Sequence, residues 1–99
     1  MLFSIVCEDI EDSLPRRKKA RPAHLEHVEV LVKAGRLLVA GPNPAIAIND
    51  PGEAGFTGSI IIAEFDSQDE AQSWADDDPY LSAGVYQSVT VKPFKKVLP

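Results

Sequence analysis

The fold is decided by the stretch Gly58-Ser59-Ile60-Ile61-Ile62-Ala63-Glu64-Phe65, which runs into Ser67-Gln68-Asp69-Glu70. A short run of isoleucines is typical of a β-strand, and this is the strongest strand signal in the chain. A serine followed three residues later by a glutamate is a capping box, which starts a helix. The second half of the chain is therefore predicted to place a strand directly before a helix.

The flanking segments predict three more strands and a second helix. Leu2–Cys7, Arg36–Ala40 and Val85–Phe94 carry β-forming apolar residues and are predicted to be strands. Pro22–Ala34 has apolar residues at helical spacing and ends before Gly35. The order βαββαβ predicts an α+β fold, a ferredoxin-like sandwich in which both helices cover one face of a four-stranded antiparallel sheet.

Two segments show no periodicity. Glu8–Lys19 is charged and is predicted to be a loop or a frayed first turn. Its basic cluster, Arg16–Lys19, lacks interleaved aromatic residues, so we expect it to be solvated or to attract an anionic substrate. Gly41–Thr57 is rich in glycine, proline, asparagine and aspartate, and loops of this length are usually functional or mobile.

The predicted strands carry apolar side chains on both faces. In the first strand Leu2 and Val6 lie opposite Phe3, and in the third Ile61 lies opposite Ile62. A bare second face of this composition would be an exposed apolar patch. The simplest cover is the same face of another subunit, so we expect a homodimer that a charge at Ile61 or Ile62, whichever faces the partner, would disrupt.

Composition limits the classes of partner. The chain of 99 residues is long enough for one domain, residues 1–99, and its net charge of −5 argues against nucleic acid or an anionic membrane as the main partner. The N-terminus lacks the basic region of a signal peptide, and no segment approaches the roughly 20 apolar residues of a membrane span. The single cysteine, Cys7, lies in an apolar run and is expected to be buried. We therefore expect a cytoplasmic protein.

A histidine in the first helix is the first candidate for chemistry. Arg21 is predicted to cap this helix and Pro22 to be its first residue, which puts His24 in the first turn. There the helix dipole disfavours the imidazolium, so a neutral ring that accepts a proton or acts as a nucleophile is expected. The alternative is that His24 is an exposed helix residue with no functional role. His27 follows at i+3, but with no matched third ligand no metal site is predicted.

A run of three aspartates ends the second predicted helix. Carboxylates there oppose the negative end of the helix dipole, and Asp78 precedes Pro79, which restricts its geometry. A carboxylate bonded to an imidazole selects the tautomer, orients the ring and stabilises its charged form. Asp78 is therefore a candidate partner of His24, the alternative being that it only caps the turn. Asp76 and Asp77 are expected to be solvated.

Several blocks of sequence resemble the YciI-like (YCII-related) family over essentially the whole chain. They are Arg21-Pro22-Ala23-His24-Leu25, Gly35-Arg36-Leu37-Leu38, Ala40-Gly41-Pro42, Ala54-Gly55-Phe56-Thr57-Gly58-Ser59, Asp78-Pro79-Tyr80, Ala83-Gly84-Val85-Tyr86 and Val91-Lys92-Pro93-Phe94-Lys95-Lys96. The resemblance implies a dimeric α+β barrel and a catalytic histidine–aspartate dyad, which here matches His24 and Asp78. One relative is associated with dehydrochlorination of a hydroxyquinol, which implies proton transfer on a small aromatic or anionic molecule, with no cofactor.

Three functions stay open at this point. In the first, a lyase or isomerase uses His24 as general base and Asp78 to orient it, while Arg21 holds a substrate oxyanion. In the second, His24 is a nucleophile that forms a phosphohistidine or another adduct. In the third, the protein binds a small molecule without turnover. In that case Phe56, Ser59 and Tyr80 would line the binding cavity.

Overall fold

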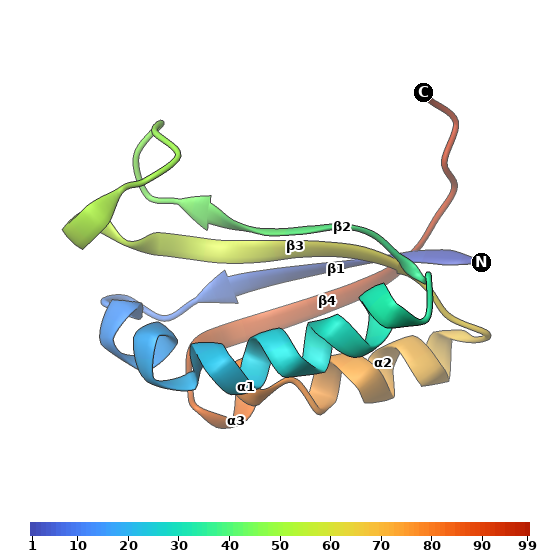
Figure 1. Ribbon diagram of the computed structural model, residues 1–99, viewed down its shortest axis with the longest axis horizontal. Helices are drawn as coiled ribbons and strands as arrows, with labels where there is room; N and C mark the ends of the chain where they lie inside the picture. Colours follow the sequence, from blue (N-terminus) through green and yellow to red (C-terminus); the bar gives the residue numbers. More distant parts are fainter.

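The computed structural model describes residues 1–99, and its element order confirms the predicted α+β fold. The elements are β1 (Leu2–Asp9), α1 (Leu14–Lys33), β2 (Leu37–Pro44), the 3₁₀ helix η1 (Gly52–Ala54), β3 (Phe56–Glu64), α2 (Gln68–Asp76), α3 (Pro79–Ser82) and β4 (Tyr86–Phe94). The strands form one antiparallel sheet in the order β2-β3-β1-β4. All three α-helices lie on one face of this sheet (Figure 1).

The core fills the space between the sheet and the helices. It consists of thirteen buried apolar or aromatic residues: Phe3, Ile5, Cys7, Val28, Leu31, Ile61, Ala63, Phe65, Ala71, Ala75, Tyr80, Val85 and Tyr86. Ser67 caps α2 as the capping box predicts, because its side chain accepts a hydrogen bond from the Glu70 N–H at 3.1 Å. No helix is long and apolar enough to cross a membrane.

Helix α1 begins earlier than the sequence pattern indicates. It starts at Leu14, takes Pro15 into its first turn and continues through Pro22, which lies inside the helix. The predicted start at Pro22, with Arg21 as its cap, is wrong: Ser13 is the N-cap, and Pro15 lies in the first turn, where a missing N–H costs no helical hydrogen bond. His24 therefore lies beyond the first turn, and the dipole argument for its neutral state does not apply.

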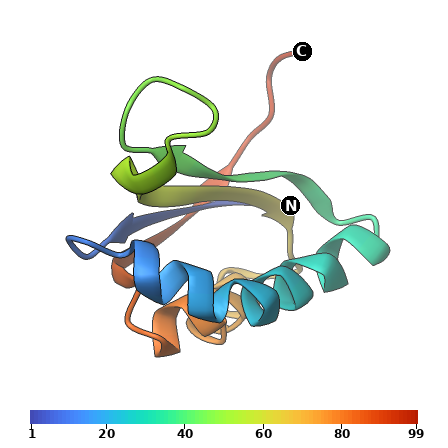
Figure 2. The same cartoon turned by 60° about the vertical axis from the view of Figure 1, so that its left-hand side comes forward.

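The predicted loop Gly41–Thr57 is shorter than expected. Strand β2 extends to Pro44 and β3 begins at Phe56, with register shifts in their pairing near Leu37 and Asn43. The connection that is left projects beyond the sheet on the side opposite the helices (Figure 2). Its 3₁₀ helix, η1, ends at Ala54 and is followed by Gly55, whose φ of 72° suits a residue without a Cβ.

A bulge in β4 decides where its first side chain points. Side chains of a regular strand alternate between the two faces of the sheet, and Val89 packs against the core. Regular alternation would therefore place Tyr86 on the other face, away from the helices. The pairing with β1 shifts by one residue between Glu8 and Asp9, so that Asp9 pairs with Tyr86. The shift turns Tyr86 toward the helices, where it is buried.

The face of the sheet away from the helices is open and partly apolar. Ile61 points into the core and is buried, whereas Ile60 and Val6 on the other face are 39% and 42% exposed. Their neighbour Ile62 is half-buried. No helix of this chain covers this surface (Figure 1), which we call the open sheet face and define by Val6, Ile60 and Ile62.

Candidate functional site

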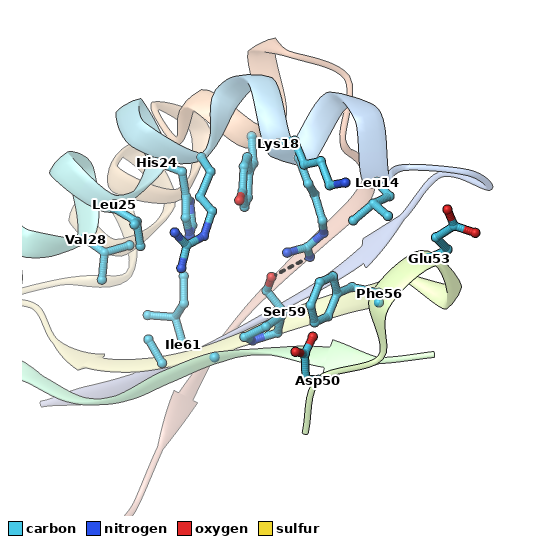
Figure 3. A pocket seen from close by; sticks show the side chains of 17 residues that line it. Leu14, Lys18, His24, Leu25, Val28, Asp50, Glu53, Phe56, Ser59 and Ile61 are labelled. Carbon is cyan, nitrogen blue, oxygen red and sulfur yellow. Dashed lines mark hydrogen bonds between the residues drawn. The ribbon is translucent and has the colours of Figure 1, made fainter. Parts of the chain in front are cut away.

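A cavity of about 660 Å³ lies between α1 and the β2–β3 edge of the sheet. Figure 3 shows His24 entering it from the helix, with Phe56 and Ser59 on the sheet side. The predicted binding residues Arg21, Phe56, Ser59 and Tyr80 all line it together with His24. The cavity has the size of ordinary small-molecule sites.

His24 and Asp78, which are far apart in the sequence, meet at one wall of this cavity. The Nδ1 atom of His24 lies 2.8 Å from Oδ1 of Asp78, and their side chains are 12% and 3% exposed. Asp78 itself does not line the cavity. The imidazole therefore faces the cavity while its carboxylate partner is buried behind it.

The short helix α3 fixes the position of Asp78. The carboxylate caps this helix, since Oδ1 accepts a hydrogen bond from the Tyr80 N–H at 2.9 Å, and Pro79 holds Asp78 in extended geometry. Asp76 ends α2 and Asp77 is its C-cap, and both are exposed. The three aspartates thus belong to two helices. The predicted repulsion between Asp78 and the negative end of the α2 dipole therefore does not explain its role, because Asp78 lies at the N-terminus of α3.

The Asp78 bond also determines which ring nitrogen of His24 is free. A carboxylate only accepts hydrogen bonds, so His24 donates from Nδ1, and Nε2 is the nitrogen that can accept a proton when the ring is neutral. The Tyr80 ring stacks on the imidazole with centroids 3.9 Å apart and planes 7° apart. Two independent contacts therefore hold the imidazole ring in one orientation.

Arg17 is the residue of the cavity that sequence reasoning missed. It was expected in a solvated loop, but it lies on α1 two turns before His24 and is buried. Its Nε and Nη2 donate to the carboxylate of Asp9 at 2.6 and 3.1 Å, and Nη2 also donates to Ser59 Oγ at 2.9 Å. A proline one residue after Leu14 was the signal that could have placed Arg17 in the helix.

The charge on Arg17 is maintained inside the protein. Burial disfavours the charged form, but the hydrogen bond and charge of Asp9 outweigh burial and raise the pKa of Arg17 above its ordinary value. The guanidinium lies 5.2 Å from the Phe56 ring centroid and 5.0 Å from that of Tyr80. The cavity wall thus contains a permanent buried cation between aromatic rings.

Three neutral acids are buried in this part of the molecule: Tyr80 lines the cavity, and Tyr86 and Cys7 belong to the core. Burial raises the pKa of Tyr80 and of Tyr86, and it raises the pKa of the Cys7 thiol from 9.0 to about 12. Cys7 is buried as predicted and is a poor nucleophile in this protonated state. The chain contains no cluster of three or more side chains suited to hold a metal ion.

The arrangement of strands and helices defines a ferredoxin-like α+β domain that has a cavity between α1 and the sheet. The YCII-related domain matches residues 1–95 of the chain. Protein YciI of Escherichia coli is 60% identical over 97 residues, which are 98% of this chain and 99% of that protein. An uncharacterized protein of Haemophilus influenzae is 50% identical over the same shares of both chains. The chain therefore belongs to the YCII-related family, as its sequence blocks indicate.

One solved structure is similar in both sequence and fold. It is the 5-chloro-2-hydroxyhydroquinone dehydrochlorinase TftG of Burkholderia phenoliruptrix, in complex with 2,5-dihydroxybenzoquinone. The sequences are 33% identical, the TM-score is 0.84, and the match covers 96% of this chain and 94% of that one. Together with the family, this likeness indicates an enzyme that processes a small molecule.

Proposed function

We propose that the protein is a cofactor-independent enzyme of the lyase or isomerase type that moves a proton on a small organic molecule. The observation that carries the proposal is the 2.8 Å contact between His24 Nδ1 and the buried Asp78 carboxylate, at the wall of a cavity. An imidazole held in this way is a general base aimed at a bound substrate.

The proposed reaction begins with proton abstraction by His24. Its free Nε2 takes a proton from a substrate C–H or O–H group, and the ring becomes an imidazolium. The buried carboxylate of Asp78 stabilises that positive charge, and the stack on Tyr80 keeps the ring in place. In an isomerase the proton then returns to another substrate atom; in a dehydrochlorinase it leaves with the departing chloride as hydrogen chloride.

The similar structure supports this class of reaction. TftG is named as a dehydrochlorinase of a hydroxylated ring, and loss of hydrogen chloride includes removal of one proton. The cavity of about 660 Å³ has room for a single ring, and Phe56 and Tyr80 supply aromatic walls. A planar hydroxylated ring or a lactone is therefore the first compound class to assay.

The test is a turnover screen of halogenated quinols and lactones with matched histidine variants. His24→Ala is expected to lower kcat/KM by about 10²–10⁴-fold, the usual contribution of a positioned proton-transfer group. His27→Ala, one turn further along α1 and outside the cavity, is the control and should stay within about twofold. Unchanged turnover in His24→Ala would contradict the proposed base. Tight binding of a compound recovered unchanged would instead identify a binding protein.

We also propose that the open sheet face forms a homodimer. Val6 and Ile60 leave apolar surface in water on a face that no helix of this chain covers, and the same face of a second subunit would bury it. Ile62→Asp changes this face, whereas Ile61 belongs to the core and is not a clean test. The wild type is expected to melt at higher temperature as its concentration rises, and Ile62→Asp to abolish that dependence. A stable wild-type monomer at micromolar concentration in light scattering would contradict the dimer.

A further inference from the structure

The guanidinium of Arg17 has one edge without a partner. Its Nε and Nη2 are engaged by Asp9, by Ser59 and by the carbonyl oxygen of Gly58, at distances between 2.6 and 3.1 Å. Nη1 makes no hydrogen bond within the chain, although it carries two N–H donors. Arg17 lines the cavity, and its side chain is only 7% exposed. Arg17 lines the cavity, so an acceptor on a bound ligand would complete the hydrogen bonding of Nη1.

Two hydroxyl groups line the same cavity and offer further donors. Ser59 Oγ accepts from Arg17 Nη2, which leaves the serine proton free to donate. The Tyr80 ring lies against the Arg17 guanidinium, with the ring centroid 5.0 Å away, and burial raises the pKa of the Tyr80 hydroxyl, which keeps it protonated as a donor. The inner wall therefore presents donors from Arg17, Ser59 and Tyr80 and no carboxylate.

The charges at the exposed rim of the cavity balance one another. Lys18 and Arg21 enter the lining from α1, and Asp50 and Glu53 enter it from the β2–β3 connection. All four are exposed, so solvent and salt screen them. Figure 3 shows Asp50 and Glu53 at the sheet side of the cavity and Lys18 on the helix side. Asp9 balances the charge of the buried Arg17, so what Arg17 offers a ligand is the charge-assisted N–H donors of Nη1.

We infer that the cavity is an anion site: Arg17 Nη1, with the hydroxyls of Ser59 and Tyr80, binds the charged oxygen of a planar ring bearing a carboxylate or phenolate. This inference rests on the proposed function and adds the substrate class to it. The ring would lie among Phe56, Tyr80 and His24, within reach of the histidine. Arg17 serves as the residue that positions the substrate, and His24 remains the base.

Binding of benzoate and of its neutral isostere benzamide tests the inference without any turnover. Isothermal titration of the His24→Ala protein is expected to give at least about tenfold tighter binding of benzoate, since a charge-assisted bond to Arg17 forms only with the anion. The double variant Asp9→Asn/Arg17→Gln removes both members of the buried ion pair and so avoids an isolated charge. It should bind the two probes equally. Lys19→Gln removes an exposed positive charge from the same helix and should keep the preference.

The outcomes separate this inference from the proposed function. Equal binding of the two probes to the His24→Ala protein, or a preference that survives in a natively folded double variant, would overturn the anion site whatever the enzyme does. If the double variant does not fold, Ser59→Ala decides: a loss of benzoate affinity of about threefold or more, with benzamide unchanged, supports the site, and no change overturns it. A preference for benzoate in a protein without turnover would leave the anion site standing and refute the enzyme.

Discussion

His24 and His27 lie one turn apart on α1, and each stacks on an aromatic ring. His24 stacks on Tyr80 at 3.9 Å and His27 on Trp74 at 4.3 Å. Each also has one hydrogen-bond partner at 2.8 Å, but the partners differ: His24 contacts the carboxylate of Asp78, and His27 contacts the backbone carbonyl of Trp74. His24 faces the cavity, whereas His27 does not line it.

Under the proposed function, the difference between the two histidines separates a reactive role for His24 from a structural role for His27. A carboxylate stabilises an imidazolium far more than a neutral carbonyl does, because it carries a full charge. A cavity lets a substrate reach the other ring nitrogen. His27 has neither feature, so its stack and hydrogen bond serve mainly to join α1 to α2. Stacking and burial alone therefore do not identify a catalytic histidine.

The largest effect is expected from a substitution that gives His24 an uncharged hydrogen-bond partner, as His27 already has. Asp78→Asn keeps an oxygen that can accept from the Tyr80 N–H but removes the charge, so turnover should fall by about 10²–10⁴-fold with the fold intact. Asp77→Asn alters an exposed neighbour and should leave kcat/KM unchanged. Steady-state kinetics measures the turnover of the two variants, and circular dichroism measures their fold. Wild-type turnover in Asp78→Asn would show that the charge of its partner does not distinguish His24 from His27.

A smaller effect is expected on stability when His27 is removed. His27→Ala leaves the Trp74 carbonyl without its partner and removes a stacked ring, which should lower the free energy of unfolding by about 1–2 kcal/mol. His27→Gln retains an N–H donor and should recover part of that loss. Urea denaturation measures the series. A His27→Ala protein as stable as the wild type would show that this contact does not join the helices.

The smallest effect concerns the ring that stacks on His24. Tyr80→Phe retains the stack and removes the hydroxyl, so stability at pH 7 should change by less than about 1 kcal/mol. Burial raises the pKa of Tyr80 above 10.0, so the tyrosine's contribution to stability is present below pH 10 and is lost as the pH rises through the folded-state pKa. The wild type should therefore lose stability above pH 10 more steeply than Tyr80→Phe. Parallel curves in thermal melts from pH 8 to 11 would contradict this.

The cavity itself could be predicted only in part. The sequence blocks indicate His24, Asp78, Arg21, Phe56, Ser59 and Tyr80, and the structure brings five of them to one cavity, with Asp78 directly behind it. Arg17 could not be recognised, because its neighbours Asp9 and Ser59 come from β1 and β3 and no local pattern links them. The prediction also misplaced the start of α1, since either Pro15 or Pro22 can begin a helix.

The sequence by itself determined the order of elements and the family. Strand and cap patterns such as Gly58–Phe65 and Ser67–Glu70 depend on backbone preferences within a few residues, and these are written in the local sequence. Only the tertiary structure decided that Arg17 is buried, that a bulge turns Tyr86 inward and that His24 differs from His27. Each of these depends on contacts between residues distant in the chain, which exist only once the sheet and helices have packed together.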